Sequence, residues 1–166
     1  MVSTKRLILK VLSADDEKVI SELFTDDIVK KTYLVPDFKD AEHLCKYFKR
    51  ILEISQGNEH YLLGIYLKDS GELLGIINDT GLNKYESAEL GYALLPRYYG
   101  KGYATEALGG MIDYLKGVGY KTIITGAFEE NIASIRVMEK NGMKRIEKTE
   151  KLVYRENEHK IVYYSI

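Results

Sequence analysis

A glycine-punctuated turn is the stretch of this sequence best suited to bind an anion. The residues from Gly100 to Thr105 follow an alternating apolar run and precede apolar residues at three- and four-residue spacing. That order predicts a strand, a turn and the start of a helix. Such a turn directs unpaired backbone N–H groups and the positive end of a helix dipole towards one point. The sequence therefore predicts a phosphate or pyrophosphate site here, although glycine turns also serve as plain connections.

The strand before this turn carries an acid beside small residues. Ser87, Glu89, Gly91 and Ala93 share one face of it, and the residues between them share the other. Gly91 and Ala93 leave room for a substrate group, and the Glu89 carboxylate can accept a proton, directly or through water. The alternative is that Glu89 is an exposed strand residue paired with a lysine, and the residues alone leave both open.

The remaining nucleophilic and metal-ligating residues form no recognisable site. Cys45 lies in the apolar stripe of a predicted helix, where a free cysteine usually behaves as a small hydrophobe. His43, His60 and His159 are scattered along the chain. Neither a zinc site nor a serine–histidine–acid triad is therefore predicted, and we expect no metal.

Length and charge bound the class of protein. The 166 residues fit a single domain, 1–166, and 24 basic against 25 acidic residues give no sign of a nucleic-acid-binding surface. No apolar run has membrane length, no signal region is present, and one cysteine allows no internal disulfide. We expect a cytoplasmic monomer or homodimer that binds neither nucleic acid nor membrane.

The elements that would position the turn and Glu89 alternate between strands and helices. Strands are predicted at 6–12, 61–67, 73–82, 86–95, 120–127, 143–153 and 159–166, and helices after Ser13, after Asp40, from Ala104 and from Asn131. Gly117 is predicted to cap the helix that follows the turn. That helix joins two strands in a right-handed crossover, which makes them parallel. We expect an α+β (α/β/α) domain with a mixed, mostly antiparallel central sheet of about seven strands and helices on both faces.

Four segments carry a resemblance to a known family. They are Thr4–Leu9, Glu89–Leu94, Tyr99–Ala107 and Asn131–Met143. In this order and spacing they make the chain similar to the GNAT superfamily of acyl-coenzyme A-dependent N-acetyltransferases, especially the branch that includes the ribosomal-protein N-terminal acetyltransferases. The resemblance covers nearly the whole chain, and it implies the GNAT fold with acetyl-coenzyme A (acetyl-CoA) as co-substrate.

The resemblance also implies which residues bind the coenzyme. In such proteins the amides matching Gly100–Thr105 hold the pyrophosphate, and the strand matching Tyr92–Leu94 pairs with the pantetheine arm like an added strand. Tyr99 stands where the superfamily usually has Arg or Gln, which removes one side-chain contact. Asn131 and Ser134 match positions that reach the pantetheine, while by themselves they would be a helix cap. The implied positions are Tyr92, Ala93, Leu94, Tyr99, Gly100, Lys101, Gly102, Tyr103, Ala104, Thr105, Asn131 and Ser134.

The implied reaction is acetyl transfer to a primary amine by direct attack in a ternary complex. Glu89 is the candidate base, because the family's second base position is Gly126 here. The usual acid is a tyrosine whose position is Met138 here, so Ser134 is the candidate substitute. Alternatively another tyrosine reaches in, or the thiol, with a pKa of about 8.5, leaves as thiolate unaided. A backbone N–H near Leu94 is the expected oxyanion donor.

Protonation energies favour a weakly basic acceptor. Deprotonating an α-amine of pKa about 8 at pH 7 costs about 1.4 kcal/mol, against about 4.6 kcal/mol for an amine with a pKa near 10.4. A peptide or protein N-terminal α-amine is therefore favoured, with a small-molecule amine left open. The alternative is a non-catalytic acyl-coenzyme A-binding or sensor domain, which Met138 and Gly126 would suit. A nucleotide-binding module is weaker, because no acid follows the turn as a dinucleotide fold requires.

Overall fold

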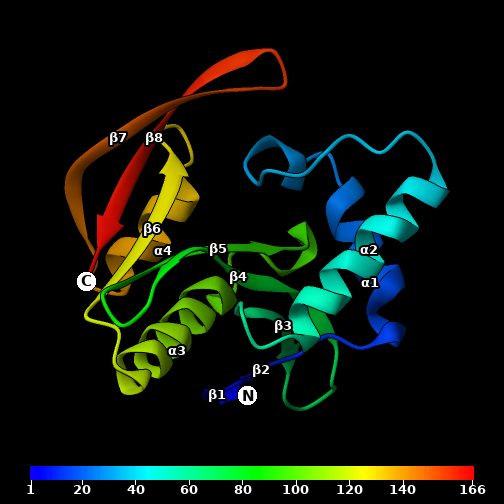
Figure 1. Ribbon diagram of the computed structural model, residues 1–166, viewed down its shortest axis with the longest axis horizontal. Coiled ribbons are helices and arrows are strands. Elements are labelled where there is room, and N and C mark those ends of the chain that lie inside the picture. Colours follow the sequence, from blue (N-terminus) through cyan, green and yellow to red (C-terminus); the bar gives the residue numbers. More distant parts are fainter.

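An open sheet of eight strands runs through the molecule and carries helices on both faces (Figure 1). The computed structural model describes residues 1–166. The strands are β1 (Val2–Ser3), β2 (Leu7–Lys10), β3 (Leu62–Leu67), β4 (Leu73–Asn83), β5 (Ser87–Leu94), β6 (Thr122–Phe128), β7 (Lys144–Tyr154) and β8 (Asn157–Ser165). The helices are α1 (Glu17–Thr25), α2 (Ala41–Gln56), α3 (Tyr103–Val118) and α4 (Ile132–Lys140), with short 3-10 turns η1 (Ala14–Asp16), η2 (Val29–Lys31) and η3 (Pro96–Tyr98).

The strand order is β1-β2-β3-β4-β5-β6-β8-β7, and only the β5–β6 pair is parallel. The predicted mixed, mostly antiparallel sheet is therefore confirmed. It has eight strands rather than about seven, because the two-residue β1 pairs with β2 and is too short to show alternation in the sequence. Helix α3 runs past Gly117 and ends at Gly119, whose φ of 114° lies in the left-handed region. The predicted cap at Gly117 was therefore wrong by two residues.

The helices cover the sheet in two pairs. Helices α1 and α2 pack on β4 and β3, while α3 and α4 contact each other and the β5–β6 pair. On β5, Gly91 lies beside the Tyr33 ring from the α1–α2 connection, and the neighbouring Tyr92 reaches Ser134 on α4. Because successive strand residues point to opposite faces, the α1–α2 pair and the α3–α4 pair cover opposite faces of β5.

The core fills both interfaces between helices and sheet. Ile20, Leu23 and Phe24 of α1 are fully buried, as their spacing predicted, and so are Leu108 and Leu115 of α3. Burial of such side chains stabilises the fold by roughly 1.5–3 kcal/mol each. These two layers hold β5 between them as a rigid strand.

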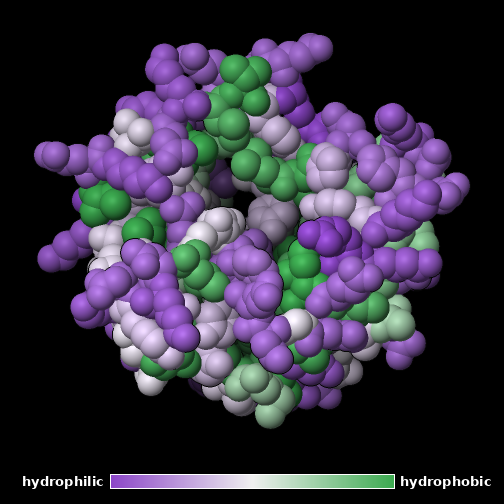
Figure 2. Space-filling model, in the orientation of Figure 1, coloured by the Kyte–Doolittle hydropathy of each residue, from purple (hydrophilic) through white to green (hydrophobic).

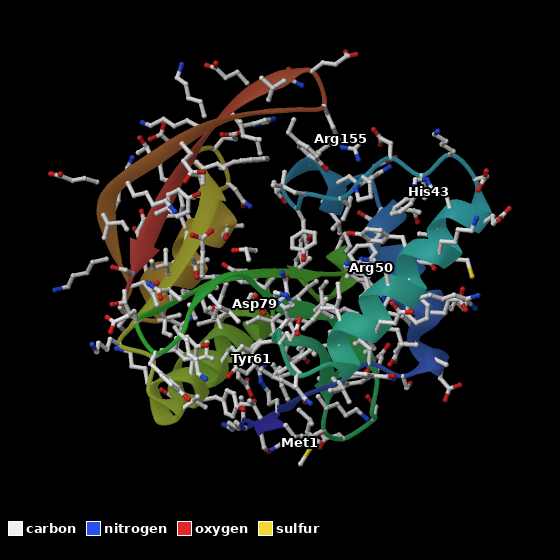
Figure 3. The ribbon with its side chains drawn as sticks, in the orientation of Figure 1. Met1, His43, Arg50, Tyr61, Asp79 and Arg155 are labelled. Atoms are coloured by element: carbon white, nitrogen blue, oxygen red, sulfur yellow. The ribbon has the colours of Figure 1, made fainter.

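A bulge in β4 brings one buried acid next to a histidine. The β4–β5 register shifts between Asp79 and Gly81, and the Asp79 side chain is 3% exposed. It accepts hydrogen bonds from the Tyr61 N–H at 2.5 Å, and its other oxygen lies 2.9 Å from Nδ1 of His60 (Figure 3). The hydrogen bond to Asp79 raises the pKa of His60 above its ordinary value. The pair therefore binds a proton more tightly in the folded state.

This pair predicts a pH dependence of stability. A raised folded-state pKa gives stabilisation that is fully present below the unfolded pKa of about 6.5 and is lost as the pH rises through the folded pKa. We expect the melting temperature to fall from pH 6 to pH 8.5 by more in the unchanged protein than in His60→Gln. Melting curves across that range test this, and equal slopes for the two proteins would contradict it.

Candidate active site

Strands β5 and β6 separate halfway along their length. Their parallel pairing joins Ser87–Leu90 to Thr122–Thr125 and goes no further. Beyond it, β5 continues to Leu94 and β6 to Phe128. The last four residues of β5 therefore keep β4 as a neighbour on one side and have no strand on the other. We call this opening the β5–β6 split.

Strand alternation shows which backbone groups face the split. The Leu95 N–H donates to the Leu74 carbonyl of β4 at 2.9 Å. In an antiparallel pair every second residue faces the same neighbour, so Ala93 faces β4 while Tyr92 and Leu94 direct their N–H and C=O groups into the split. An extended chain can pair with such free groups as an added strand. Of the three predicted pantetheine residues, Tyr92 and Leu94 thus offer backbone groups, and Ala93 is buried.

The glycine turn presents a row of free donors at the end of this strand. None of the backbone N–H groups from Gly100 to Thr105 donates to another group of the protein, and no side chain caps α3. Gly100 and Gly102 have φ angles of 73° and 79°, in the left-handed region that favours glycine. Free N–H groups and the positive end of a helix dipole are the features from which an anion site was predicted for this turn. Tyr99, directly before the turn, is 47% exposed.

Two residues that the sequence did not reveal fix the carbonyls of this turn. Nη1 of Arg6 donates to the Lys101 carbonyl at 3.1 Å, and Nδ2 of Asn141 donates to the Thr105 carbonyl at 3.1 Å. These hydrogen bonds fix two carbonyls of the turn while its N–H groups stay free. No local pattern could have found these contacts, because Arg6 and Asn141 lie 95 and 36 positions from their partners.

Tyr92 and Ser134 meet on the α3–α4 face of the sheet. The Tyr92 hydroxyl lies 2.8 Å from Oγ of Ser134, and burial raises the pKa of Tyr92 to about 12. The phenol is therefore protonated throughout the neutral range. Asn131 caps α4 by accepting from the Ser134 N–H at 3.1 Å, which confirms its structural interpretation. Met138, at the family's tyrosine position, is fully buried in the core.

Glu89 lies on the opposite face of β5 and has two partners. Its carboxylate accepts hydrogen bonds from the Thr80 hydroxyl at 3.1 Å and from Nζ of Lys148 at 3.1 Å. The lysine pairing considered as the alternative for Glu89 is therefore present. Burial works against the charged Lys148, but its hydrogen bond with Glu89 raises its pKa above the ordinary lysine value. Glu89 thus forms an ion pair with Lys148, and its side chain is 26% exposed.

The second base position is covered by an aromatic ring. A Cβ atom at Gly126 would lie 2.7 Å from the Tyr163 ring, so a larger residue there would require that ring to move. Lys148 lies over the same ring, with Nζ 3.9 Å from its centre. Burial raises the pKa of Tyr163 to about 12, so this phenol is no base near neutral pH. Glu89 is therefore the candidate base that remains on this face.

A short bridge spans the face that carries Glu89. At the β7–β8 tip, the Tyr154 hydroxyl donates to the Tyr33 carbonyl at 3.2 Å, and Arg155 pairs with Asp37 (Figure 3). Figure 2 shows the surface hollowed below this bridge, between β6 and the α1–α2 connection of Figure 1. Within this region Asn78 accepts from the Tyr33 hydroxyl at 2.7 Å, beside Gly91. Polar side chains therefore lie next to Gly91 of β5.

Two other hollows lie away from the split. One of about 500 Å³ lies between Met1–Thr4 and α3, and one of about 330 Å³ lies beneath the β4–β5 turn at Tyr61, Tyr85 and Tyr120. Neither is lined by a predicted site residue. The structure contains no cluster of three or more His, Cys, Asp or Glu side chains able to hold a metal ion. None of its helices has the length and apolarity to cross a membrane.

Ser134 and Tyr92 can be tested as one unit. We expect Ser134→Ala and Tyr92→Phe each to lower kcat/KM by about tenfold, since each removes one hydrogen bond. If both act on the same proton, kcat/KM of the double variant should be only slightly lower than that of the less active single variant. Steady-state kinetics of the four proteins measure this, and fully multiplicative losses would contradict a shared role.

Comparison with known proteins agrees with this geometry. The family model described as an acetyltransferase (GNAT) domain matches residues 6–144. A protein described as uncharacterised N-acetyltransferase YnaD of Bacillus subtilis is 30% identical over 164 residues, covering 98% of this chain and 94% of that protein. The solved GNAT-family acetyltransferase from Bacillus anthracis has a TM-score of 0.84 and 26% identity, covering 99% and 96% of the two chains.

More distant structures share the fold. The ribosomal L7/L12 α-N-protein acetyltransferase RimL, solved with coenzyme A, has a TM-score of 0.83 at 17% identity, covering 100% of this chain and 96% of its own. The match over 139 of 166 residues, counted from 6 to 144, is decisive for the family. This chain belongs to the GNAT acetyltransferase family and is an acetyl-CoA-dependent N-acetyltransferase.

Proposed function

We propose that this enzyme acetylates N-terminal α-amines of peptides or proteins, with small-molecule amines as the second acceptor class. The observation that supports the site is the row of free N–H groups from Gly100 to Thr105, next to the free strand edge at Tyr92 and Leu94. Glu89, on the other face of β5, is a single carboxylate base, which suits an amine of modest pKa. RimL, named as an α-N-protein acetyltransferase, has the same fold.

In this proposal the two faces of β5 have separate tasks. On the α3–α4 side, the turn holds the coenzyme pyrophosphate, Tyr92 and Leu94 pair with the pantetheine, and Asn131 and Ser134 border it. Bound acetyl-CoA supplies an activated thioester. The acceptor amine approaches from the side of Glu89, beneath the bridge between Tyr154 and Tyr33. Each backbone contact fixes the thioester relative to the amine, which is the positional contribution to the rate.

The proton transfers follow from the same arrangement. Glu89 accepts the proton that the attacking amine loses, through a water molecule, while Lys148 holds the carboxylate in place through its hydrogen bond. The Leu94 N–H, free of any strand partner, stabilises the negative charge that develops on the thioester oxygen. Ser134, hydrogen-bonded to the protonated Tyr92, donates to the departing thiolate. The proposed setting is cytoplasmic and reducing, where Cys45 stays a thiol.

An amine panel tests the acceptor class. Release of coenzyme A from acetyl-CoA is followed with N-terminal peptides, amino acids, polyamines and aminoglycosides, and each product is identified by mass. We expect the highest kcat/KM among N-terminal peptides. Highest activity with a polyamine would instead assign a small-molecule acceptor.

The same panel tests the alternative of a non-catalytic acyl-coenzyme A sensor, which the family assignment argues against. The ion pair between Glu89 and Lys148, the buried Met138 and the covered Gly126 are the features that would suit such a sensor, since together they leave few free acid–base groups. It predicts tight coenzyme binding with no transfer to any amine of the panel. Turnover well above the rate without enzyme would exclude it.

A further inference from the structure

Arg6, just before β2, is fixed against the coenzyme turn from the far end of the chain. Its Nε donates to Glu106 at 2.7 Å, its Nη1 donates to the Lys101 carbonyl at 3.1 Å, and its guanidinium carbon lies 4.5 Å from the centre of the Tyr103 ring. The backbone N–H of Arg6 also donates to Glu106, at 2.6 Å. Three side-chain contacts and one backbone contact therefore hold Arg6 against the turn and the first residues of α3.

Glu106 holds the inner edge of the guanidinium. Its side chain is 16% exposed, and it also accepts a hydrogen bond from the Thr4 hydroxyl at 2.6 Å. Burial works to raise its pKa, but hydrogen bonds from Thr4 and Arg6 outweigh this and lower the pKa below the ordinary value for glutamate. A carboxylate that stays ionised at neutral pH keeps the Nε edge of Arg6 pointing inward.

The outer edge of the same guanidinium is free. Nη2 of Arg6 has no hydrogen-bond partner in the protein, and it lies 3.5 Å from the place where a Cβ atom of Gly102 would be. The side chain is 43% exposed. Two N–H donors of a permanent cation therefore lie next to Gly102 of the turn. Tyr99, at the position where the superfamily usually has Arg or Gln, brings no charge.

We propose that Arg6 binds a phosphate group of the coenzyme through Nη2, while its Nη1 and Nε hold the turn in the shape that gathers its N–H groups. Arg6 thereby supplies the cation that the turn lacks at Tyr99. The proposal rests on the assignment of Gly100–Thr105 as the pyrophosphate site. The forked guanidinium suits both tasks, because it can bond inward and outward at once, which a lysine ammonium on a flexible stem does less well.

Ligand truncation separates phosphate binding from support of the fold. Dissociation constants of Arg6→Gln and the unchanged protein are measured by NMR titration for coenzyme A, dephospho-coenzyme A and pantetheine, with no acceptor present. We expect coenzyme A to bind 10- to 100-fold more weakly to Arg6→Gln, the size of one hydrogen bond to a charged group. Pantetheine, which has no phosphate, should bind both proteins within about threefold.

Each outcome of this series has a meaning. An equal penalty for dephospho-coenzyme A assigns Arg6 to the pyrophosphate, and a smaller one assigns it to the 3′-phosphate. An equal loss for pantetheine, or no loss for coenzyme A, would overturn the proposal. If the unchanged protein binds pantetheine as tightly as coenzyme A, the assignment of the turn itself fails, whatever Arg6 does.

Two further variants keep the test sound. Lys5→Gln removes the same charge from the neighbouring exposed residue, which has no hydrogen bond in the protein, and should bind coenzyme A like the unchanged protein. Arg6→Lys keeps the cation and loses the fork, so we expect an intermediate penalty confined to the phosphate-bearing ligands. Should Arg6→Gln melt at too low a temperature for titration, Arg6→Lys provides the same three-ligand comparison.

Discussion

Replacing Glu89 with glutamine is expected to lower kcat/KM for the amine by about 100-fold at pH 7, because an amide cannot accept the proton of the attacking amine. The KM for acetyl-CoA should stay within about twofold, since Glu89 lies on the face of β5 that points away from Tyr92 and Ser134. Initial rates with both substrates varied measure the two constants. The difference in kcat/KM between the unchanged protein and Glu89→Gln should become smaller as the pH rises, because more of the amine is then already neutral.

Glu150 provides a matched control for this variant. Its carboxylate also lies near Nζ of Lys148, at 3.4 Å, against 3.1 Å for Glu89. Glu150→Gln removes the same charge from the same lysine but leaves the residue on β5 unchanged, so we expect its activity to stay within about threefold. Equal losses in the two variants, or an unchanged rate in Glu89→Gln, would rule out Glu89 as the base.

Gly75→Ala is expected to destabilise the protein by about 3 kcal/mol or more, the upper range for overpacking a core position. Gly75 of β4 lies opposite Leu94, and a Cβ atom there would lie 2.0 Å from the Ala93 carbonyl oxygen. A backbone atom cannot turn away as a side chain can, so β5 must move. Urea unfolding measures the loss of stability. Because Leu94 carries the proposed oxyanion donor, kcat/KM measured without urea should also fall.

Gly117→Ala, also a glycine-to-alanine change, is expected to have the opposite effect on stability. Gly117 lies within α3, with no atom within 4 Å of an added Cβ and a φ angle outside the left-handed region. Alanine in such a helix position should stabilise the protein by about 0.5–1 kcal/mol. If Gly75→Ala and Gly117→Ala have similar free energies of unfolding, close packing of β4 against β5 is not what fixes the position of Leu94.

The sequence predicted the parts of the site that depend on local order. Alternation along 86–95 correctly separated Gly91 from Tyr92 onto opposite faces, and the glycines of the turn have the positive φ angles that it requires. The spacing after the turn gave the buried stripe of α3. These features depend on neighbours within a few residues, which is the range over which periodicity carries information.

Contacts between distant segments were beyond that range. The pairing of Glu89 with Lys148 spans 59 positions, and that of Arg6 with Glu106 spans 100. The first depends on the order of β6, β7 and β8 in the sheet, and the second on how α3 packs beside the segment before β2; the sequence pattern leaves both open. Strand β1 escaped prediction for a different reason, because two residues are too few to show alternation.

The most direct test of the proposed function is a competition within one acceptor. A peptide carrying a free N-terminal α-amine and an internal lysine is incubated with the enzyme and acetyl-CoA, and the modified position is found by fragmentation mass spectrometry. We expect one acetyl group, on the N-terminal amine. Acetylation of the lysine, or no transfer while the protein still binds coenzyme A, would contradict the proposal.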